Sequence, residues 1–204
     1  IVISFISNYN TSRNMSIKKQ ADKIYAKIQA YFFDLEASHG KGSYIYDKNQ
    51  KPYLDFSGGI AVVSTGHCHP DVVQAIQNQA EKLIHSCFAV AYSEPPIQLA
   101  QKLIECTQQQ LDSVYFCQSG TEAVEAALKC AKYVSKKSKV IAFKGGFHGR
   151  SMGSLSVTSS KDKYRDGFGP MVPGVTFYPY PYPYRCKQKC DSSDYKKQCV
   201  SELK

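Results

Sequence analysis

The stretch that decides the fold runs from Ser113 to Arg150 and reads SVYFCQSGTEAVEAALKCAKYVSKKSKVIAFKGGFHGR. It begins with a short apolar run over 113–117 and continues through a helical pattern over 122–133 whose inner face is rich in alanine. A second apolar run follows over 140–143. Strand, helix and strand in this order predict a βαβ unit, and therefore a parallel sheet in an α/β protein.

The loop from Gln118 to Thr121 enters the predicted helix at the carboxyl end of the first strand, where open parallel sheets bind ligands. Ser119 and Glu122 have the spacing of a capping box. Free amides and the helix dipole at such an end attract an anion, of which phosphate is the obvious example. Gly120 lets the backbone approach it, and Thr121 adds a hydroxyl. Spacing alone fits a plain helix cap as well, and the Walker nucleotide-binding pattern is absent.

A second, glycine-rich loop covers 144–150 and offers an aromatic ring at Phe147 and a guanidinium at Arg150. An aromatic side chain can stack on a flat ring, and an arginine can hold a carboxylate through two parallel hydrogen bonds. On its own this loop also fits a turn with a core phenylalanine and a surface arginine.

The chain offers little support for a metal site. His67 and His69 are near neighbours without a distant ligand, and a turn that leads into Pro70 explains them better. Three late cysteines have no second pair of ligands near them, so we expect no zinc there; they are Cys186, Cys190 and Cys199.

Outside the central stretch, apolar spacing and turn residues predict further elements. The predicted helices cover 17–36, 71–84, 96–106 and 194–204. The predicted strands cover 44–47 and 53–56, joined by a turn over 47–51, with a further strand over 155–158. The proline-rich segment 178–184 is predicted to be extended and irregular.

The 204 residues are 43% hydrophobic and 21% charged, which is typical of a folded chain and excludes a disordered or collagen-like one. No run of about 18 apolar residues predicts a membrane span. The net charge of +9 is spread along the chain, so we expect no nucleic-acid partner. Five of the eight cysteines lie in apolar or helical patterns, and no signal peptide is visible, which together predict free thiols and a cytoplasmic location.

Four blocks of sequence, in this order, resemble the class III aminotransferases, which are pyridoxal-phosphate enzymes. The blocks are Tyr53–Val62, Gly66–Pro70, Ser119–Lys129 and Phe147–Arg150. The resemblance covers about 17–183 and implies the aspartate-aminotransferase-like α/β fold, also called fold type I. Within the class the chain looks most like the 4-aminobutyrate aminotransferases, with the acetylornithine and ornithine enzymes as the alternative.

The resemblance also implies site residues. Ser119, Gly120 and Thr121 match the positions that bind the cofactor phosphate, Phe147 matches the aromatic that stacks on the pyridine ring, and His148 is expected in the same cofactor site.

Two further positions are expected to bind substrate. Arg150 matches the arginine that holds a substrate carboxylate, and Ile60 matches a residue that lines the substrate pocket. The chain departs from the family at Gln118, where asparagine is common, and at Ala89, where the bacterial 4-aminobutyrate enzymes carry a polar residue.

The resemblance implies that the chain is the N-terminal part of a longer enzyme. Residues 1–65 are expected to be an N-terminal segment of the small domain, with 1–14 disordered, and 66–204 part of the large cofactor-binding domain. The family's Schiff-base lysine, the aspartate that pairs with the pyridinium nitrogen and a substrate-side glutamate are expected beyond Lys204, so the chain alone is expected to be inactive and poorly soluble.

The expected reaction is the transfer of an amino group from an ω-amino acid, such as 4-aminobutyrate, to a 2-oxo acid such as 2-oxoglutarate. It would use pyridoxal 5′-phosphate in a homodimer. The alternatives are an acetylornithine- or ornithine-type enzyme, and a truncated fragment that binds phosphate or dimerises without catalysis.

Overall fold

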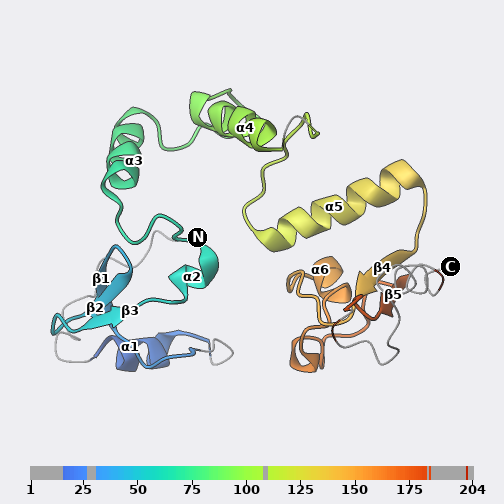
Figure 1. Cartoon of the computed structure of the whole chain (residues 1–204), viewed down its shortest axis with the longest axis horizontal. Coiled ribbons are helices and arrows are strands. Elements are labelled where there is room, and N and C mark those ends of the chain that lie inside the picture. The colour runs from blue at the N-terminus through green and yellow to red at the C-terminus, as the bar shows by residue number, and fades with distance from the viewer. Residues whose placement is uncertain (1–15, 27–30, 108–109, 183, 185–200, 202–204) are drawn as a thin grey trace. The chain divides into compact units, whose positions relative to one another are not determined.

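The computed structural model describes residues 16–26, 31–107, 110–182, 184 and 201 (Figure 1). The chain divides into two compact units, 1–93 and 94–204, and each is described here by itself. The expected domain boundary after residue 65 stays a prediction about the whole protein.

The first unit is built around a three-stranded antiparallel sheet in the order β1-β2-β3 (Figure 1). The strands are β1 (Ala37–Lys41), β2 (Tyr44–Asp47) and β3 (Pro52–Leu54). Asp47 closes the turn between β2 and β3, because its Oδ1 accepts from the amides of Asn49 and Lys51 at 2.8 and 3.0 Å. The predicted hairpin over 44–56 is confirmed in outline, whereas β1 was not predicted.

Two helices accompany this sheet in the same unit, α1 (Ile17–Ile24) and α3 (Pro70–Lys82). The short segment α2 (Gly58–Ala61) lies between them in the chain, and its backbone is left-handed rather than an ordinary α-helix. The predicted helix over 71–84 is confirmed in outline as α3, which Pro70 opens in the position where its missing amide proton costs nothing. The predicted helix over 17–36 was too long, because α1 ends at Ile24 and the described residues 25–26 and 31–36 are not helical. The Glu36 carboxylate accepts from the Lys18 amide at 3.0 Å, so the chain must leave the helix and turn back to its first turn.

The second unit contains α4 (Glu94–Cys106), α5 (Gly120–Ser135), β4 (Val140–Phe143), α6 (Met152–Ser156), the 3₁₀ turn η1 (Asp162–Tyr164) and β5 (Val175–Tyr178). Strands β4 and β5 pair in parallel, from Val140 opposite Val175 to Phe143 opposite Tyr178. The predicted helices over 122–133 and 96–106 and the predicted strand over 140–143 are confirmed. A parallel pair is present, but the partner of β4 is β5, which was not predicted, and not the predicted strand over 113–117. The irregular backbone predicted after Tyr178 is confirmed for 179–182.

Two predicted strands are wrong. Residues 113–117 form no strand among the described residues, because a strand needs a neighbour for its amides and carbonyls and none of the described segments pairs with them. Residues 155–158 lie at the end of α6 and just beyond it. There the Ser156 hydroxyl donates to the Met152 carbonyl at 2.6 Å and closes a helical turn in a sequence that had predicted a strand. The predictions over 1–14 and 194–204 fall outside the described residues, apart from residue 201.

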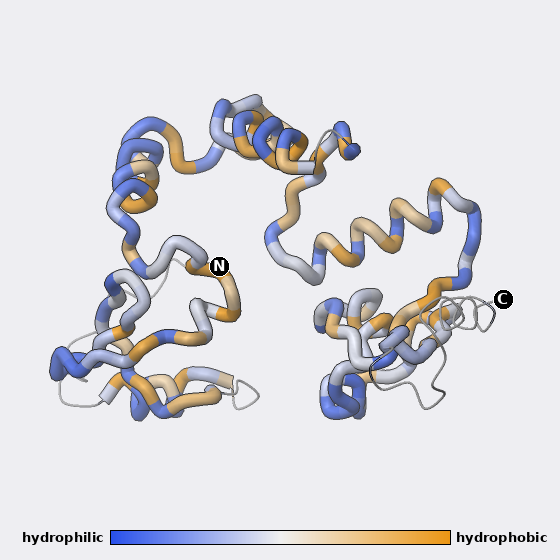
Figure 2. The backbone as a smooth tube through the Cα atoms, in the orientation of Figure 1, coloured by the Kyte–Doolittle hydropathy of each residue, from blue (hydrophilic) through white to orange (hydrophobic). Residues whose placement is uncertain are grey.

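The buried core of the described residues is small and lies around α6 and β4. Its apolar members are Ala142, Leu155 and Val157, and Ser154, Ser156 and Thr158 are buried with them. Apolar residues recur along the exposed α5 (Figure 2). A cavity of about 520 Å³ lies against that helix, lined by Tyr115, Cys117, Ala123, Ala126, Ala127, Lys129 and Cys130.

Candidate functional site

The amino end of α5 forms the predicted helix cap. The Ser119 hydroxyl accepts from the Glu122 amide at 3.3 Å, and the Glu122 carboxylate accepts from the Gln118 amide at 2.7 Å. The carboxylate therefore reaches one residue further back than in the standard capping box, where it meets the amide of the cap residue itself. Extended backbone at Ser119 turns its side chain onto the first turn and fixes where the helix begins.

The amides of Gly120 and Thr121 stand at the positive end of this sixteen-residue helix and have no acceptor among the described residues. A side chain at position 120 would meet no heavy atom within 4 Å, so there is open space in front of this backbone. Two amides without a described acceptor at the amino end of a helix, beside open space at Gly120, fit a bound phosphate.

The Thr121 hydroxyl is not free for such a ligand. It lies 2.7 Å from the Ser151 hydroxyl and 2.5 Å from the Ser154 hydroxyl, and it accepts from the Ser151 amide at 3.2 Å. The expectation that this side chain donates to a phosphate therefore rests on a hydroxyl that already has protein partners. The backbone amide of Thr121 is the better anion ligand.

The glycine-rich loop at 144–150 is held against this helix through Gly149. That residue is buried at φ +130°, and a Cβ there would meet the Thr121 hydroxyl and, at 2.5 Å, the Ser154 hydroxyl. The buried Thr158 hydroxyl donates to the Gly149 carbonyl at 3.0 Å and accepts from the His148 amide at 2.9 Å. The loop thus has one fixed path past the first turn of α5.

Three predicted site residues follow that path with exposed side chains. The Phe147 ring lies edge to face with the Tyr164 ring, with 5.6 Å between the two ring centroids. Phe147 is still 54% exposed, which leaves surface for a flat ligand. The His148 imidazole lies back over Gly146, where a Cβ would be 2.8 Å from its Nε2. Arg150 follows Gly149 directly and is exposed to solvent. The structure therefore brings Phe147, His148 and Arg150 into the segment that contacts Thr121.

Ile60 belongs to the other unit and lies on a strained loop. Gly59, Ile60 and Ala61 all have positive φ, at 67°, 62° and 61°. For a β-branched residue this conformation is a genuine outlier, of the kind that clusters at functional sites. Ile60 is 83% exposed.

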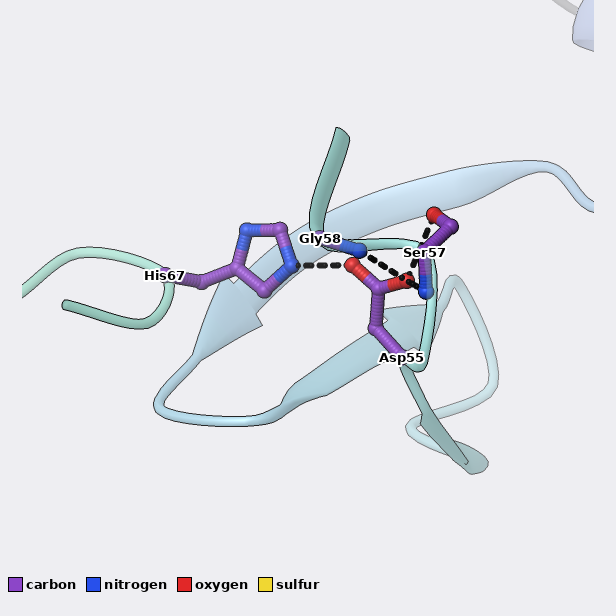
Figure 3. Close-up of polar contacts among 4 residues, drawn as sticks. All are labelled: Asp55, Ser57, Gly58 and His67. Carbon is purple, nitrogen blue, oxygen red and sulfur yellow. Dashed lines mark hydrogen bonds and ion pairs between the residues drawn. The ribbon is translucent and has the colours of Figure 1, made fainter. Parts of the chain in front are cut away.

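A carboxylate holds the start of this loop (Figure 3). Asp55 Oδ1 accepts from the Ser57 hydroxyl at 2.7 Å and from the amides of Ser57 and Gly58 at 2.8 and 3.0 Å. Its Oδ2 lies 2.8 Å from His67 Nε2, with the Asp55 side chain only 7% exposed. The Ser57 hydroxyl, then His67 and the two amides, hold the pKa of the Asp55 carboxyl far below its ordinary value. His67 is thereby part of the local structure, as expected.

Residue patterns alone missed a second carboxylate, Glu125. Its Oε1 accepts from the Ser151 hydroxyl at 2.5 Å and from the Ser154 amide at 2.9 Å. The Ser151 hydroxyl, followed by the amides of Ser154 and Gly153, lowers the pKa of the Glu125 carboxyl. One signal was present: Glu125 stands one helical turn after Thr121, among the alanines of the inner face, where a charge needs partners.

Several absences hold for the described part of the chain. No group of three potential metal ligands occurs in it, and none of its helices is long and apolar enough to cross a membrane. Cys186, Cys190 and Cys199 lie outside the described residues, whereas five others are free thiols there: Cys68, Cys87, Cys106, Cys117 and Cys130.

Comparison with protein families gives one match: the model of the class-III aminotransferases covers residues 24–204. The acetylornithine aminotransferase of Methanopyrus kandleri is 46% identical over 166 residues, which are 81% of this chain and 42% of that protein. That of Archaeoglobus fulgidus is 49% identical over 138 residues, or 68% of this chain and 36% of that protein. The chain thus spans about two fifths of the length of these curated relatives.

A solved structure shows the same architecture. The ornithine aminotransferase of Toxoplasma gondii superposes with a TM-score of 0.72 at 28% identity, over 82% of this chain and 40% of that one. The expected fold type I architecture is therefore confirmed. The expectation that the chain is most like 4-aminobutyrate aminotransferases needs correction, because these relatives carry acetylornithine names and match the alternative.

Proposed function

The chain belongs to the class III aminotransferase family, and we propose that the whole protein moves the terminal amino group of an acetylornithine-like ω-amino acid to a 2-oxo acid. The names of the curated relatives support this donor over 4-aminobutyrate. The observation that carries the proposal is that the loop with Phe147 and Arg150 contacts Thr121 in the first turn of α5, where the Gly120 and Thr121 amides have no acceptor among the described residues.

The residues of this chain fit pyridoxal 5′-phosphate. The amides of Gly120 and Thr121, with the Ser119 cap beside them, would bind its phosphate, and the exposed ring of Phe147 would lie against its pyridine ring. His148 would line the same site. Bound pyridoxal phosphate supplies an electron sink for the amino transfer.

Arg150 would bind the carboxylate of the amino donor. Its guanidinium can form two parallel hydrogen bonds with that group, and this would orient a donor whose amine lies at the other end of the molecule. Ile60 would line the substrate pocket of the whole protein, as the family resemblance implies.

Donor specificity can be measured with the whole protein loaded with pyridoxal phosphate. Glutamate formation from 2-oxoglutarate should show a higher kcat/KM with N-acetylornithine than with ornithine or 4-aminobutyrate. Arg150→Ala should raise the KM of the donor roughly tenfold or more, which is the loss of about one charged hydrogen bond. Lys137→Ala is the matched control, because it removes a positive charge beyond the far end of α5. Unchanged kinetics in Arg150→Ala would remove Arg150 from this role.

We also propose that the whole protein is a cytoplasmic homodimer without a nucleic-acid partner. The family resemblance supports the dimer, because sites of this class form between two subunits. Sedimentation equilibrium of the whole protein gives the test, and a monomer at micromolar concentration with full activity would contradict it.

A further inference from the structure

Hydrogen-bonded hydroxyl groups link the first turn of α5 to α6. Glu125 lies at one end of them and fixes which way the Ser151 hydroxyl donates. A carboxylate only accepts hydrogen bonds, so the Ser151 hydroxyl must donate to Glu125. The Ser151 oxygen is then left to accept from Thr121 or Ser154, which lie 2.7 and 2.9 Å away. The carboxylate therefore fixes the direction of the Ser151 hydroxyl and ties it to the hydrogen-bonded group that also contains Thr121 and Ser154.

The contacts around Glu125 and Thr121 leave no room for an added side chain at two nearby glycines. A Cβ at Gly153 would run into the Glu125 carboxylate, just as one at Gly149 would run into Thr121. Ser154 is completely buried, and its amide donates to Glu125. The carboxylate consequently sits where it holds both the start of α6 and the residues directly after Arg150.

We propose that Glu125 is a positioning residue: it locks the 147–151 loop onto the first turn of α5, so that the phosphate-binding amides, the Phe147 ring and the Arg150 guanidinium keep one relative geometry. The locking itself is a property of this chain. Its consequence for pyridoxal phosphate and for the amino donor rests on the proposed function.

Hydrogen exchange in the cofactor-free whole protein tests the locking. Glu125→Ala should speed exchange of the Ser151 and Ser154 amides by about tenfold or more, the effect of losing one charged hydrogen bond. The decisive amide is that of His148, which bonds to Thr158 and not to Glu125. It should also exchange faster if Glu125 holds the whole loop, and unchanged exchange there would overturn the proposal.

Two further variants separate positioning from loss of the fold. Glu125→Gln keeps an acceptor oxygen and should stay within about threefold of the unmodified exchange rates. Glu105→Gln is the matched control, because its carboxylate lies on the exposed face of α4 and pairs only with Lys102 in the described residues. If Glu125→Ala fails to fold, Ser151→Ala provides the same break, since it removes the hydroxyl between Glu125 and Thr121. Normal His148 exchange in Ser151→Ala would then count against the proposal.

Binding and kinetics give the second readout. Glu125→Ala should raise both the Kd of pyridoxal phosphate and the KM of the amino donor about tenfold, and Glu125→Gln should restore both. Combining Glu125→Ala with Ser151→Ala should add little to either single effect, because the two act through one linkage. Additive effects would overturn the proposal. If the unmodified protein binds no pyridoxal phosphate while the His148 amide responds as expected, the proposed function fails and the positioning role stands.

Discussion

Each unit of the chain uses one carboxylate to hold a loop that bears a predicted site residue, but the two carboxylates work over different distances. Asp55 Oδ1 binds groups two and three positions ahead and so shapes the loop that leads to Ile60. Glu125 binds groups 26 and 29 positions ahead and joins two helices beside Arg150. The first arrangement is a local turn with one added partner, His67, whereas the second exists only after the chain has folded.

The difference matters for what each region can tolerate. Around Asp55 the partners are the exposed Ser57, the half-buried Gly58 amide and one imidazole that is 20% exposed, so we expect the loop to relax when a contact is lost. Around Glu125 the partners include buried hydroxyls and two glycines without room for a side chain. We therefore expect substitutions near Glu125 to cost more than those near Asp55.

Gly149→Ala should have the largest effect. Its Cβ would collide with Thr121 and Ser154, and its φ of +130° disfavours any side chain. Together these should lower the free energy of unfolding by about 3 kcal/mol and abolish tight binding of pyridoxal phosphate. Urea unfolding and a cofactor titration of the whole protein measure both.

Gly145→Ala is the matched control for that substitution. Gly145 also has a positive φ, of 86°, but open space around it, so it should show only the backbone cost of about 1 kcal/mol. Equal losses in the two variants would mean that the close contact with Thr121 contributes nothing.

Thr158→Val should come second. The substitution keeps the shape of the side chain and removes a fully buried hydroxyl. That hydroxyl accepts from the His148 amide and lies within donating distance of the Gly149 and Ser154 carbonyls. Unpaired buried groups should lower the free energy of unfolding by about 2 kcal/mol. Thr176→Val on β5 is exposed and should stay within about 0.5 kcal/mol of the unmodified protein. A loss in Thr158→Val no larger than in Thr176→Val would contradict the view that this hydroxyl fixes the loop.

The same difference in distance explains what the sequence could predict. The cap at Ser119, the helix behind it and the β2–β3 turn depend on residues a few positions apart, and all three were predicted. The partners of Glu125 depend on tertiary folding, and so does the failure of 113–117 to form a strand, because a strand exists only beside a neighbour. The same holds for the Thr121 hydroxyl, which already has protein partners. The sequence motif located Thr121, but its partner Ser151 lies 30 positions away in the chain and could not be predicted from the motif.

The third-largest effect should be a difference between Asp55 and Glu125 in how strongly each makes stability depend on acid pH. Both have a folded-state pKa below the ordinary value, so the unfolded chain binds more protons and stability falls as the pH drops through about 4 and below. The larger lowering belongs to Asp55. Asp55→Asn should therefore flatten the decline of the urea midpoint between about pH 5 and pH 2 more than Glu125→Gln does. Identical declines in Asp55→Asn and the unmodified protein would show that the Asp55 contacts add no stability.

Ile60→Gly should have the smallest effect on stability, and an opposite sign. Relief of the left-handed conformation at φ 62° is worth about 1 to 2 kcal/mol, and the added freedom of glycine in the unfolded chain costs about 1 kcal/mol. The side chain is 83% exposed, so little burial is lost, and the free energy of unfolding should rise by about 0.5 kcal/mol.

The matched comparison is Ile76→Gly in α3, where the isoleucine is also exposed, at 63%, but the backbone is helical. There glycine should lower the free energy of unfolding by about 0.5 kcal/mol or more. If Ile60→Gly destabilises the protein as much as Ile76→Gly does, the strained backbone at Ile60 carries no energy, and the loop held by Asp55 is then free to adopt ordinary conformations. If Ile60→Gly stabilises the protein but raises the KM of the amino donor, the strain is retained for substrate binding, which is the result we expect.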